Sequence, residues 1–508
     1  MNSLKIKYLK FGVIGLILLT VGSQIYSLVN MKGFWLDEWF ILYNIKFHSY
    51  SGLFGNLFYM QQFPRIYLCI VKFISELFNY NYFAIRVLPF SIQVINVLLV
   101  YFLISKIVFP NSKLKAFLFI LFFLSFHTTI FYFSQLKAYT MDIFFTFMSI
   151  WYFYYLSRNY KTIKIKSFGY VGMLFFIFSG SFFSYTFPIV VTPILFIFLI
   201  TFLSEFFKGK LSLKPLIPIV IFMVALVLNY FTDLKFVLTN KGQYQNFDMY
   251  VMQYHSLGSI IKSLFNIVWI FTSMFFFDKA YNTYFLGLLY FVKIIVLISA
   301  LSGFLLVFYR NFIKLKIKKI KYFSTISYFN APGIEIYLLG LFFATLVLYF
   351  LKMLPVGTHR INYFCFTFST YFLITGVFFI ISKYNRIKYF LLPIILFASI
   401  FPTIRMNINE INGSDMDFDQ KIYVNVGKAV LAAQSVHLPI IVSYNEFYPA
   451  SIMEGQESLM IKAHHDYKPK DSIPVFVINK NEMVATLKNL KIDRYIFITK
   501  YNYKTVLP

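Results

Sequence analysis

The sequence predicts an all-α polytopic membrane protein that ends in a small α/β domain. Of its 508 residues, 59% are hydrophobic and only 13% are charged, whereas soluble domains carry about 25% charged residues. Through residues 1–402, apolar runs approach the length of roughly 20 residues that crosses a hydrocarbon core as a helix. Residues 403–508 have an ordinary soluble composition. We therefore expect a transmembrane domain over 1–402 and a soluble domain over 403–508.

The apolar runs predict about 11 transmembrane helices, separated by short basic segments. The first run follows a basic segment and could instead be a signal peptide. We favour a span because the run from Phe11 to Val29 is long enough to cross a membrane and no Ala-x-Ala site follows it. The expected spans are 9–29, 84–104, 116–133, 141–156, 167–183, 187–204, 215–231, 283–309, 333–351, 361–382 and 389–403.

The distribution of charge predicts the orientation of these spans. Residues 1–402 hold 35 of the 47 Lys and Arg residues and only nine of the 20 Asp and Glu residues. Six clusters, among them Arg158 to Lys166, hold 22 of those basic residues and alternate onto one side. The positive-inside rule makes that side cytoplasmic. We therefore expect a multi-pass protein of the cytoplasmic (inner) membrane, with a cytoplasmic N-terminus and an extracytoplasmic C-terminal domain. Nucleic acid is not needed to explain the net charge of +27.

A carboxylate pair, Asp37 and Glu38, lies soon after the first span and is flanked by aromatic residues. Trp and Tyr at such a position are typical interface anchors, but ionised groups near a membrane boundary are costly and tend to be functional. Asp37 and Glu38 are therefore candidate catalytic residues. Glu38 either orients Asp37 or the acceptor, or it is a solvated neighbour of Asp37. The outer loop 31–83 that contains the pair is predicted to hold amphipathic interfacial helices at 50–60 and 64–78.

The order of these segments resembles the GT-C glycosyltransferases. Four segments carry the resemblance: the Asp-Glu pair, Pro64-Arg65-Ile66-Tyr67, the segment 83–89 leading into the second span, and the turn 134–142. The turn resembles the Gln-x-x-Arg-x-Tyr turn of these enzymes, with Lys137 at the position of the basic residue. Within that superfamily the chain looks most like the branch of protein O-mannosyltransferases and lipid A aminoarabinose transferases. It departs from the branch in the first loop, where Gln61-Gln62-Phe63 precedes Pro64.

The resemblance implies transfer of a sugar from a polyprenyl-phosphate donor to an acceptor hydroxyl at the outer face of the membrane. Asp37 would then be the general base, and direct attack would invert the anomeric carbon. Outer-side cations would bind the donor phosphate, and three further residues would line the substrate. The candidate phosphate ligands are Arg65, Arg86, Lys137, Lys352, His359 and Arg360, and the lining candidates are Tyr139, Asp142 and Tyr363.

Neither a cofactor nor a nucleotide sugar is required by this sequence. Cys69 and Cys365 form no CxxC motif, so they do not indicate a thiolate metal site. Binding of a divalent metal by the Asp37/Glu38 pair is left open as an alternative. The expected partners are the lipid-linked donor, membrane lipids and a glycan, lipid or protein acceptor. A transporter or flippase, or a ligase of lipid-linked sugars, is the alternative function. A transporter is expected to show internal repeats and ionisable sites near the bilayer midplane.

The two remaining predictions concern a second outer loop, 232–282, and the C-terminal domain. In the latter, β-rich runs at 439–442, 475–478 and 495–498 alternate with helical patterns at 418–435, 448–463 and 480–489. This alternation predicts a small α/β layer with a partly parallel sheet. This layer could contact the acceptor or cap the cleft that the interfacial helices of the first loop are expected to frame beside the bilayer.

Overall fold

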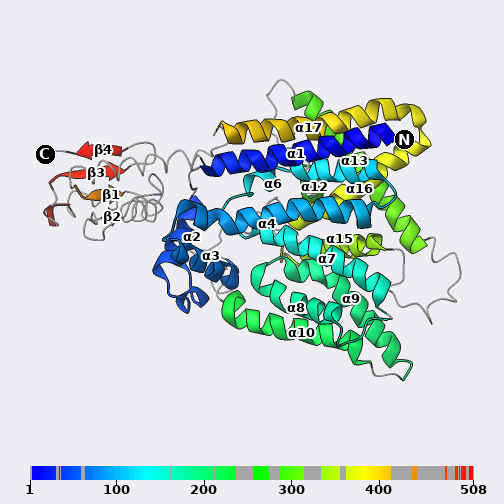
Figure 1. The fold of residues 1–508 in the computed structure, drawn as a ribbon, viewed down its shortest axis with the longest axis horizontal. Helices are drawn as coiled ribbons and strands as arrows, with labels where there is room; N and C mark the ends of the chain where they lie inside the picture. Colours follow the sequence, from blue (N-terminus) through cyan, green and yellow to red (C-terminus); the bar gives the residue numbers. More distant parts are fainter. Residues whose placement is uncertain are drawn as a thin grey trace. The chain divides into compact units, whose positions relative to one another are not determined.

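The protein is described from a computed structural model, whose helices and strands Figure 1 shows. The chain divides into two compact units. The first unit comprises residues 1–22, 91–133 and 138–407, and the second comprises 23–90, 134–137 and 408–508. The structure describes residues 3–29, 34, 36–58, 63–160, 162–209, 212–235, 256–273, 286–313, 333–354, 362–412, 438–442, 475–477, 487–489, 491, 493–498 and 503–506.

Long helices account for most of the described residues. Seven of the described helices are long and apolar enough to cross a membrane, as judged by length and composition, so the chain is an integral membrane protein. The long helices are α1 (Ser3–Val29), α4 (Tyr82–Leu103), α5 (Lys113–Ser125), α7 (Tyr139–Asn159), α8 (Phe168–Phe183), α9 (Phe187–Phe206), α10 (Leu213–Asn229), α12 (Leu257–Ser273), α13 (Leu286–Phe308), α15 (Ile334–Phe350), α16 (Phe366–Lys383) and α17 (Lys388–Ile411).

Each predicted span overlaps helical residues in the described part of the chain, but the count of 11 stays a prediction. The helices α5, α8 and α15 have 13, 16 and 17 residues, and α7 is not among the seven. The single span predicted over 116–133 is wrong, because the backbone is extended at Phe126 (ψ 121°) and a second helix, α6 (His127–Phe131), begins after it. Within the predicted outer loop 232–282, residues 257–273 form α12.

Close packing of α13 against α16 organises part of the first unit. A Cβ atom built on Gly303 would lie 1.8 Å from the carbonyl oxygen of Phe372, and one built on Gly376 would lie 1.7 Å from that of Ser299. Only glycine therefore fits at either position. Small residues that let two backbones touch are a common device for joining helices in membranes. In the same unit α8, α9 and α10 pack side by side (Figure 1).

A polar cluster around Glu335 joins three helices of the first unit. Helix α13 continues into a π-helical turn, Tyr309–Ile313, which carries Arg310 and Asn311. Arg310 forms an ion pair with Glu335 at the start of α15, and Asn311 Nδ2 donates to Glu335 Oε2 at 2.8 Å. Tyr371 of α16 donates to Glu335 Oε1, also at 2.8 Å. The carboxylate thus connects the ends of α13, α15 and α16.

The first loop in the second unit differs from its prediction in two places. Helix α2 (Leu36–Phe47) was not expected, and the stretch 50–60 is not an amphipathic helix, because only the 3₁₀ turn Gly52–Phe54 forms among its described residues. The predicted helix at 64–78 is present as α3 (Arg65–Leu77). In α3, charged Arg65 and Lys72 are buried while Phe73 and Leu77 are exposed. This inverted pattern suits an apolar surrounding.

A four-stranded sheet in the second unit contains the three strands expected near the C-terminus. Strands β1 (Ile440–Val442), β2 (Val475–Val477), β3 (Tyr495–Ile498) and β4 (Tyr503–Val506) have the order β2-β1-β3-β4. Strand β1 pairs with β2 and β3 in parallel, and β4 pairs with β3 in antiparallel. The predicted helices at 418–435 and 448–463 lie outside the described residues, as does most of 480–489, so a separate α/β domain over 403–508 stays a prediction.

Candidate functional site

The carboxylate of Glu38 is the centre of a buried polar cluster in the second unit. Glu38 is the third residue of α2 and is 0% exposed. Its Oε2 lies 3.2 Å from Arg86 Nη2, and its Oε1 accepts a hydrogen bond from the backbone N–H of Leu136 at 2.8 Å. The hypothesis that Glu38 is a solvated neighbour of Asp37 is therefore wrong. The backbone of Asp37 lies in the first turn of α2, and its side chain is outside the described part.

Arg86 is held by aromatic faces as well as by Glu38. The guanidinium carbon lies 4.3 Å from the centroid of the Phe34 ring and 5.0 Å from that of Tyr82, distances at which the ring quadrupole attracts a cation. Trp39 is also buried, with its ring 5.5 Å from Phe34. Trp39 therefore packs inside the protein instead of anchoring it in lipid. Because Arg86 pairs with a protein carboxylate, its predicted binding of a donor phosphate stays a prediction.

The turn 134–137 brings Lys137 beside the first loop. The Lys137 backbone N–H donates to the Gln135 carbonyl at 2.7 Å, which closes a tight three-residue turn. The Tyr67 hydroxyl donates to the Lys137 carbonyl at 3.3 Å, and the Lys137 ammonium lies 4.7 Å from the centroid of the Phe63 ring. Burial, together with the negative charge of Glu38, raises the pKa of Tyr67, so this phenol stays protonated and donates.

Two further polar side chains are buried in the same unit. Arg65, the first residue of α3, is 3% exposed. The Gln135 amide is fully buried, and neither its oxygen nor its nitrogen has a hydrogen-bond partner among the described residues. A buried amide without partners is costly, so a polar group at this position, from the chain or from a ligand, would be stabilising. The sequence analysis included Gln135 only as part of the turn 134–142. Nothing in the sequence indicated that its side chain is buried.

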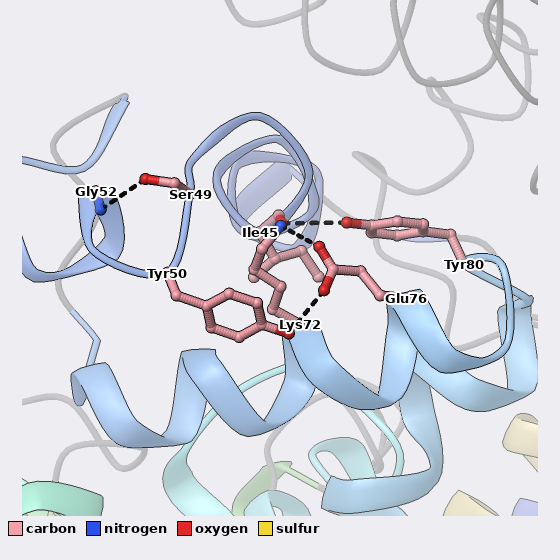
Figure 2. Close-up of polar contacts among 7 residues, drawn as sticks. All are labelled: Ile45, Ser49, Tyr50, Gly52, Lys72, Glu76 and Tyr80. Carbon is pink, nitrogen blue, oxygen red and sulfur yellow. Dashed lines mark hydrogen bonds and ion pairs between the residues drawn. The ribbon is translucent and has the colours of Figure 1, made fainter.

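A second cluster holds α2 against α3, as Figure 2 shows. The Lys72 ammonium donates to the carbonyl of Ile45 near the C-terminal end of α2, at 2.6 Å, and lies 2.6 Å from Glu76 Oε1. The hydroxyl of Tyr50 donates to Glu76 Oε2 at 2.6 Å, and that of Tyr80 donates to Ile45 at 3.3 Å. A cation at a helix C-terminus is favoured by the helix dipole, so Lys72 caps α2.

The charges of this cluster contribute to shifts in the pKa values of Glu76 and of the nearby His48. Although burial disfavours ionisation of Glu76, hydrogen bonds from Lys72 and Tyr50 outweigh it and lower the pKa of the carboxyl. Burial, and then the positive charges of Arg65 and Lys72, lower the pKa of His48 below its ordinary value of 6.5. His48 is therefore neutral at physiological pH.

The remaining predicted residues that are described belong to the first unit. Tyr363 is fully buried, and its hydroxyl lies 2.7 Å from Thr129 Oγ1 and accepts from Gln93 at 3.2 Å. Asp142 is buried and accepts a short hydrogen bond from Ser184. Tyr139 packs edge-on against Tyr132, and Lys352 is in a turn after α15 with a φ of +56°. His359 and Arg360 lie outside the described residues.

The Glu38 carboxylate is placed to form an ion pair and not to bind a metal ion. Both of its oxygens are engaged, one by a guanidinium that would repel a nearby cation. Within the described residues, no group of three or more His, Cys, Asp or Glu side chains gathers where it could hold a metal ion.

Comparisons with known proteins give only a weak likeness. No family model matches the chain, and no curated protein matches it. Among solved structures it is similar to the oligosaccharyltransferase of Archaeoglobus fulgidus in complex with Zn and sulfate, with 12% identity, a TM-score of 0.48, and coverage of 96% of this chain and 67% of that one. The same enzyme tethered to an acceptor peptide has 12% identity and a TM-score of 0.43, with coverage of 96% and 69%. Likenesses of this size are too weak to assign a fold, an activity or a substrate.

Proposed function

We propose that this chain is a GT-C type glycosyltransferase. It moves a sugar from a polyprenyl-phosphate donor to an acceptor hydroxyl at the outer face of the cytoplasmic membrane. In this proposal the N-terminus is cytoplasmic and the C-terminal residues are extracytoplasmic. The sugar comes from a lipid in the outer leaflet and not from a nucleotide sugar in the cytoplasm.

One observation carries the proposal: four segments that separately resemble GT-C motifs are joined in one compact unit. Glu38 of the carboxylate pair bonds to Arg86 from the segment 83–89 and to the backbone of the turn 134–137. Tyr67 of the Pro-x-x-Tyr segment bonds to the same turn at Lys137. These segments are up to about a hundred residues apart in sequence, and a catalytic site needs such convergence because its groups must be held in one geometry.

The proposed reaction needs a general base for the acceptor hydroxyl and cations for the departing phosphate. Asp37 takes the proton of the acceptor hydroxyl as that oxygen attacks the anomeric carbon, and the bond from this carbon to the phosphate oxygen breaks. Arg65 and Lys137, buried in the same unit, stabilise the departing phosphate. Arg86 and Glu38 position the first turn of α2. Direct attack inverts the anomeric carbon, which NMR of the purified product checks.

The test is substitution of the proposed base with its neutral isostere. Asp37→Asn is expected to lower product formation by about 10²- to 10⁴-fold, the usual contribution of general base catalysis. Mass spectrometry of the cell envelope measures the glycan product and the polyprenyl-phosphate-sugar donor, and the donor is expected to accumulate. Asp493→Asn is the matched control, because Asp493 is an exposed residue outside the cluster.

Two results would count against this proposal. Unchanged glycans in Asp37→Asn cells, with the variant inserted at wild-type levels, would remove Asp37 from catalysis. Loss of the donor from the outer leaflet, with donor retained on the cytoplasmic side, would favour a transporter instead.

A further inference from the structure

A basic cavity lies in the first unit where α7 ends and α8 begins. Its volume is about 420 Å³. The chain between the two helices is tied down by hydrogen bonds, since Thr162 Oγ1 donates to the Asn159 carbonyl at 3.1 Å and Ser167 Oγ donates to the Lys164 carbonyl at 2.7 Å. The cavity is lined by Tyr155, Asn159, Thr162, Ile163, Lys164, Lys166 and Ser167.

The charge of the cavity favours an anion. Lys164 and Lys166 are exposed lining residues, and no lining residue carries a carboxylate. The hydroxyls of Thr162 and Ser167 already donate to backbone carbonyls. The two ammonium groups are therefore the charged donors that a phosphate oxygen would meet.

One wall of the cavity is aromatic and closely fitted. Tyr155 packs so tightly on α8 that a Cβ atom at Gly169 would lie 2.2 Å from the Tyr155 hydroxyl. Trp151, one helical turn before Tyr155, stacks on it with ring centroids 5.9 Å apart. Trp and Tyr side by side in a membrane protein are typical of the depth where lipid headgroups lie.

The flank of the cavity is apolar and faces away from the protein. Phe168, the first residue of α8, is 93% exposed, and Val171 and Phe175 are 51% and 71% exposed. Because these positions are three and seven residues apart, they form one stripe along α8 that begins beside Lys166. An exposed apolar stripe of this kind is typical of a surface that contacts lipid.

We propose that this cavity binds the headgroup of an anionic phospholipid. The phosphate lies between Lys164 and Lys166, and an acyl chain runs along Phe168, Val171 and Phe175. A free phosphate would use only the lysines and leave the stripe uncovered, whereas a phospholipid matches both features. Basic pockets beside transmembrane helices bind anionic headgroups elsewhere. The site is independent of the proposed glycosyl transfer, and its test does not measure activity.

The test is native mass spectrometry of the purified full-length chain in detergent. The two probes are phosphatidylglycerol and phosphatidylcholine with identical acyl chains. The wild type is expected to retain phosphatidylglycerol preferentially. Lys164→Gln/Lys166→Gln is expected to weaken this binding roughly ten- to thirty-fold, as removal of two lysines at a membrane surface predicts. Lys383→Gln/Arg386→Gln is the control, because it removes the same charge from exposed residues of another predicted cytoplasmic segment.

Three outcomes would overturn the proposal. Equal retention of the two lipids would show that the headgroup charge is not recognised. An equal loss of phosphatidylglycerol binding in the cavity variant and the control variant would show that the lipid responds to overall charge and not to this site. Displacement of phosphatidylglycerol by millimolar inorganic phosphate would show a small-anion site with no role for the apolar stripe.

Discussion

Two glutamate–arginine pairs in this protein use the same side chains in opposite surroundings. The side chains of Glu38 and Arg86 are both 0% exposed, whereas those of Glu335 and Arg310 are 15% and 43% exposed. A buried pair is expensive to form, and removal of one partner strands a charge. Removal of one partner from an exposed pair lowers the stability of the protein only slightly, because water solvates the charge that remains. The surroundings therefore decide what each pair contributes.

The largest expected effect comes from breaking the buried pair. Arg86→Met should destabilise the protein by about 3–5 kcal/mol, because the Glu38 carboxylate is left in an apolar site. Thermal unfolding in detergent measures the loss. The double variant Glu38→Gln/Arg86→Met removes the stranded charge and should recover part of the stability. Strictly additive losses would show that the two side chains are not coupled.

Breaking the half-exposed pair should cost much less. Arg310→Gln is expected to lower stability by less than about 1 kcal/mol, because Glu335 keeps the hydrogen bonds from Tyr371 and Asn311 and is partly reached by water. The same unfolding assay applies, and Tyr371→Phe serves as a neutral comparison at the same carboxylate. A loss as large as that of Arg86→Met would contradict the distinction by burial.

The smallest expected effect is a pH dependence from His48 in the first loop, which also carries Glu38 of the buried pair. Burial and the charges of Arg65 and Lys72 lower the pKa of His48 below 6.5 in the folded state. The unfolded chain therefore binds more protons as pH falls below about 6.5, and stability declines in that range. His48→Gln should flatten this part of the curve of unfolding temperature against pH. An identical slope in both proteins would assign the effect to another group.

Sequence reasoning placed the helices well because apolar length is a local signal. The helices at 84–104, 167–183 and 187–204 each match within a few residues. The break at Phe126 and the helix α2 were missed, since neither interrupts the apolar or aromatic composition. The strands β1, β2 and β3 were located by short β-branched runs, but β4 was not expected.

The candidate site was predicted as a set of segments and not as contacts. Spacing and residue type identified Glu38, Arg86 and Lys137, but only the fold shows that the two charges pair with one another. The donor to Glu38 is a backbone N–H at Leu136, which has no signature in a sequence. The contacts of Phe34 with Arg86 and of Phe63 with Lys137 could not be predicted for a different reason. In a chain with 68 Phe residues, the sequence does not indicate which rings contact a cation.

The glycine contacts between α13 and α16 determine which motions are open to the first unit. Packed helices slide past one another on an interlocked layer of side chains, and at Gly303 and Gly376 that layer is missing, because each glycine faces the backbone of the other helix. We therefore expect the two helices to move together, and we expect any rearrangement to occur where other helices meet this pair or in the loops between them.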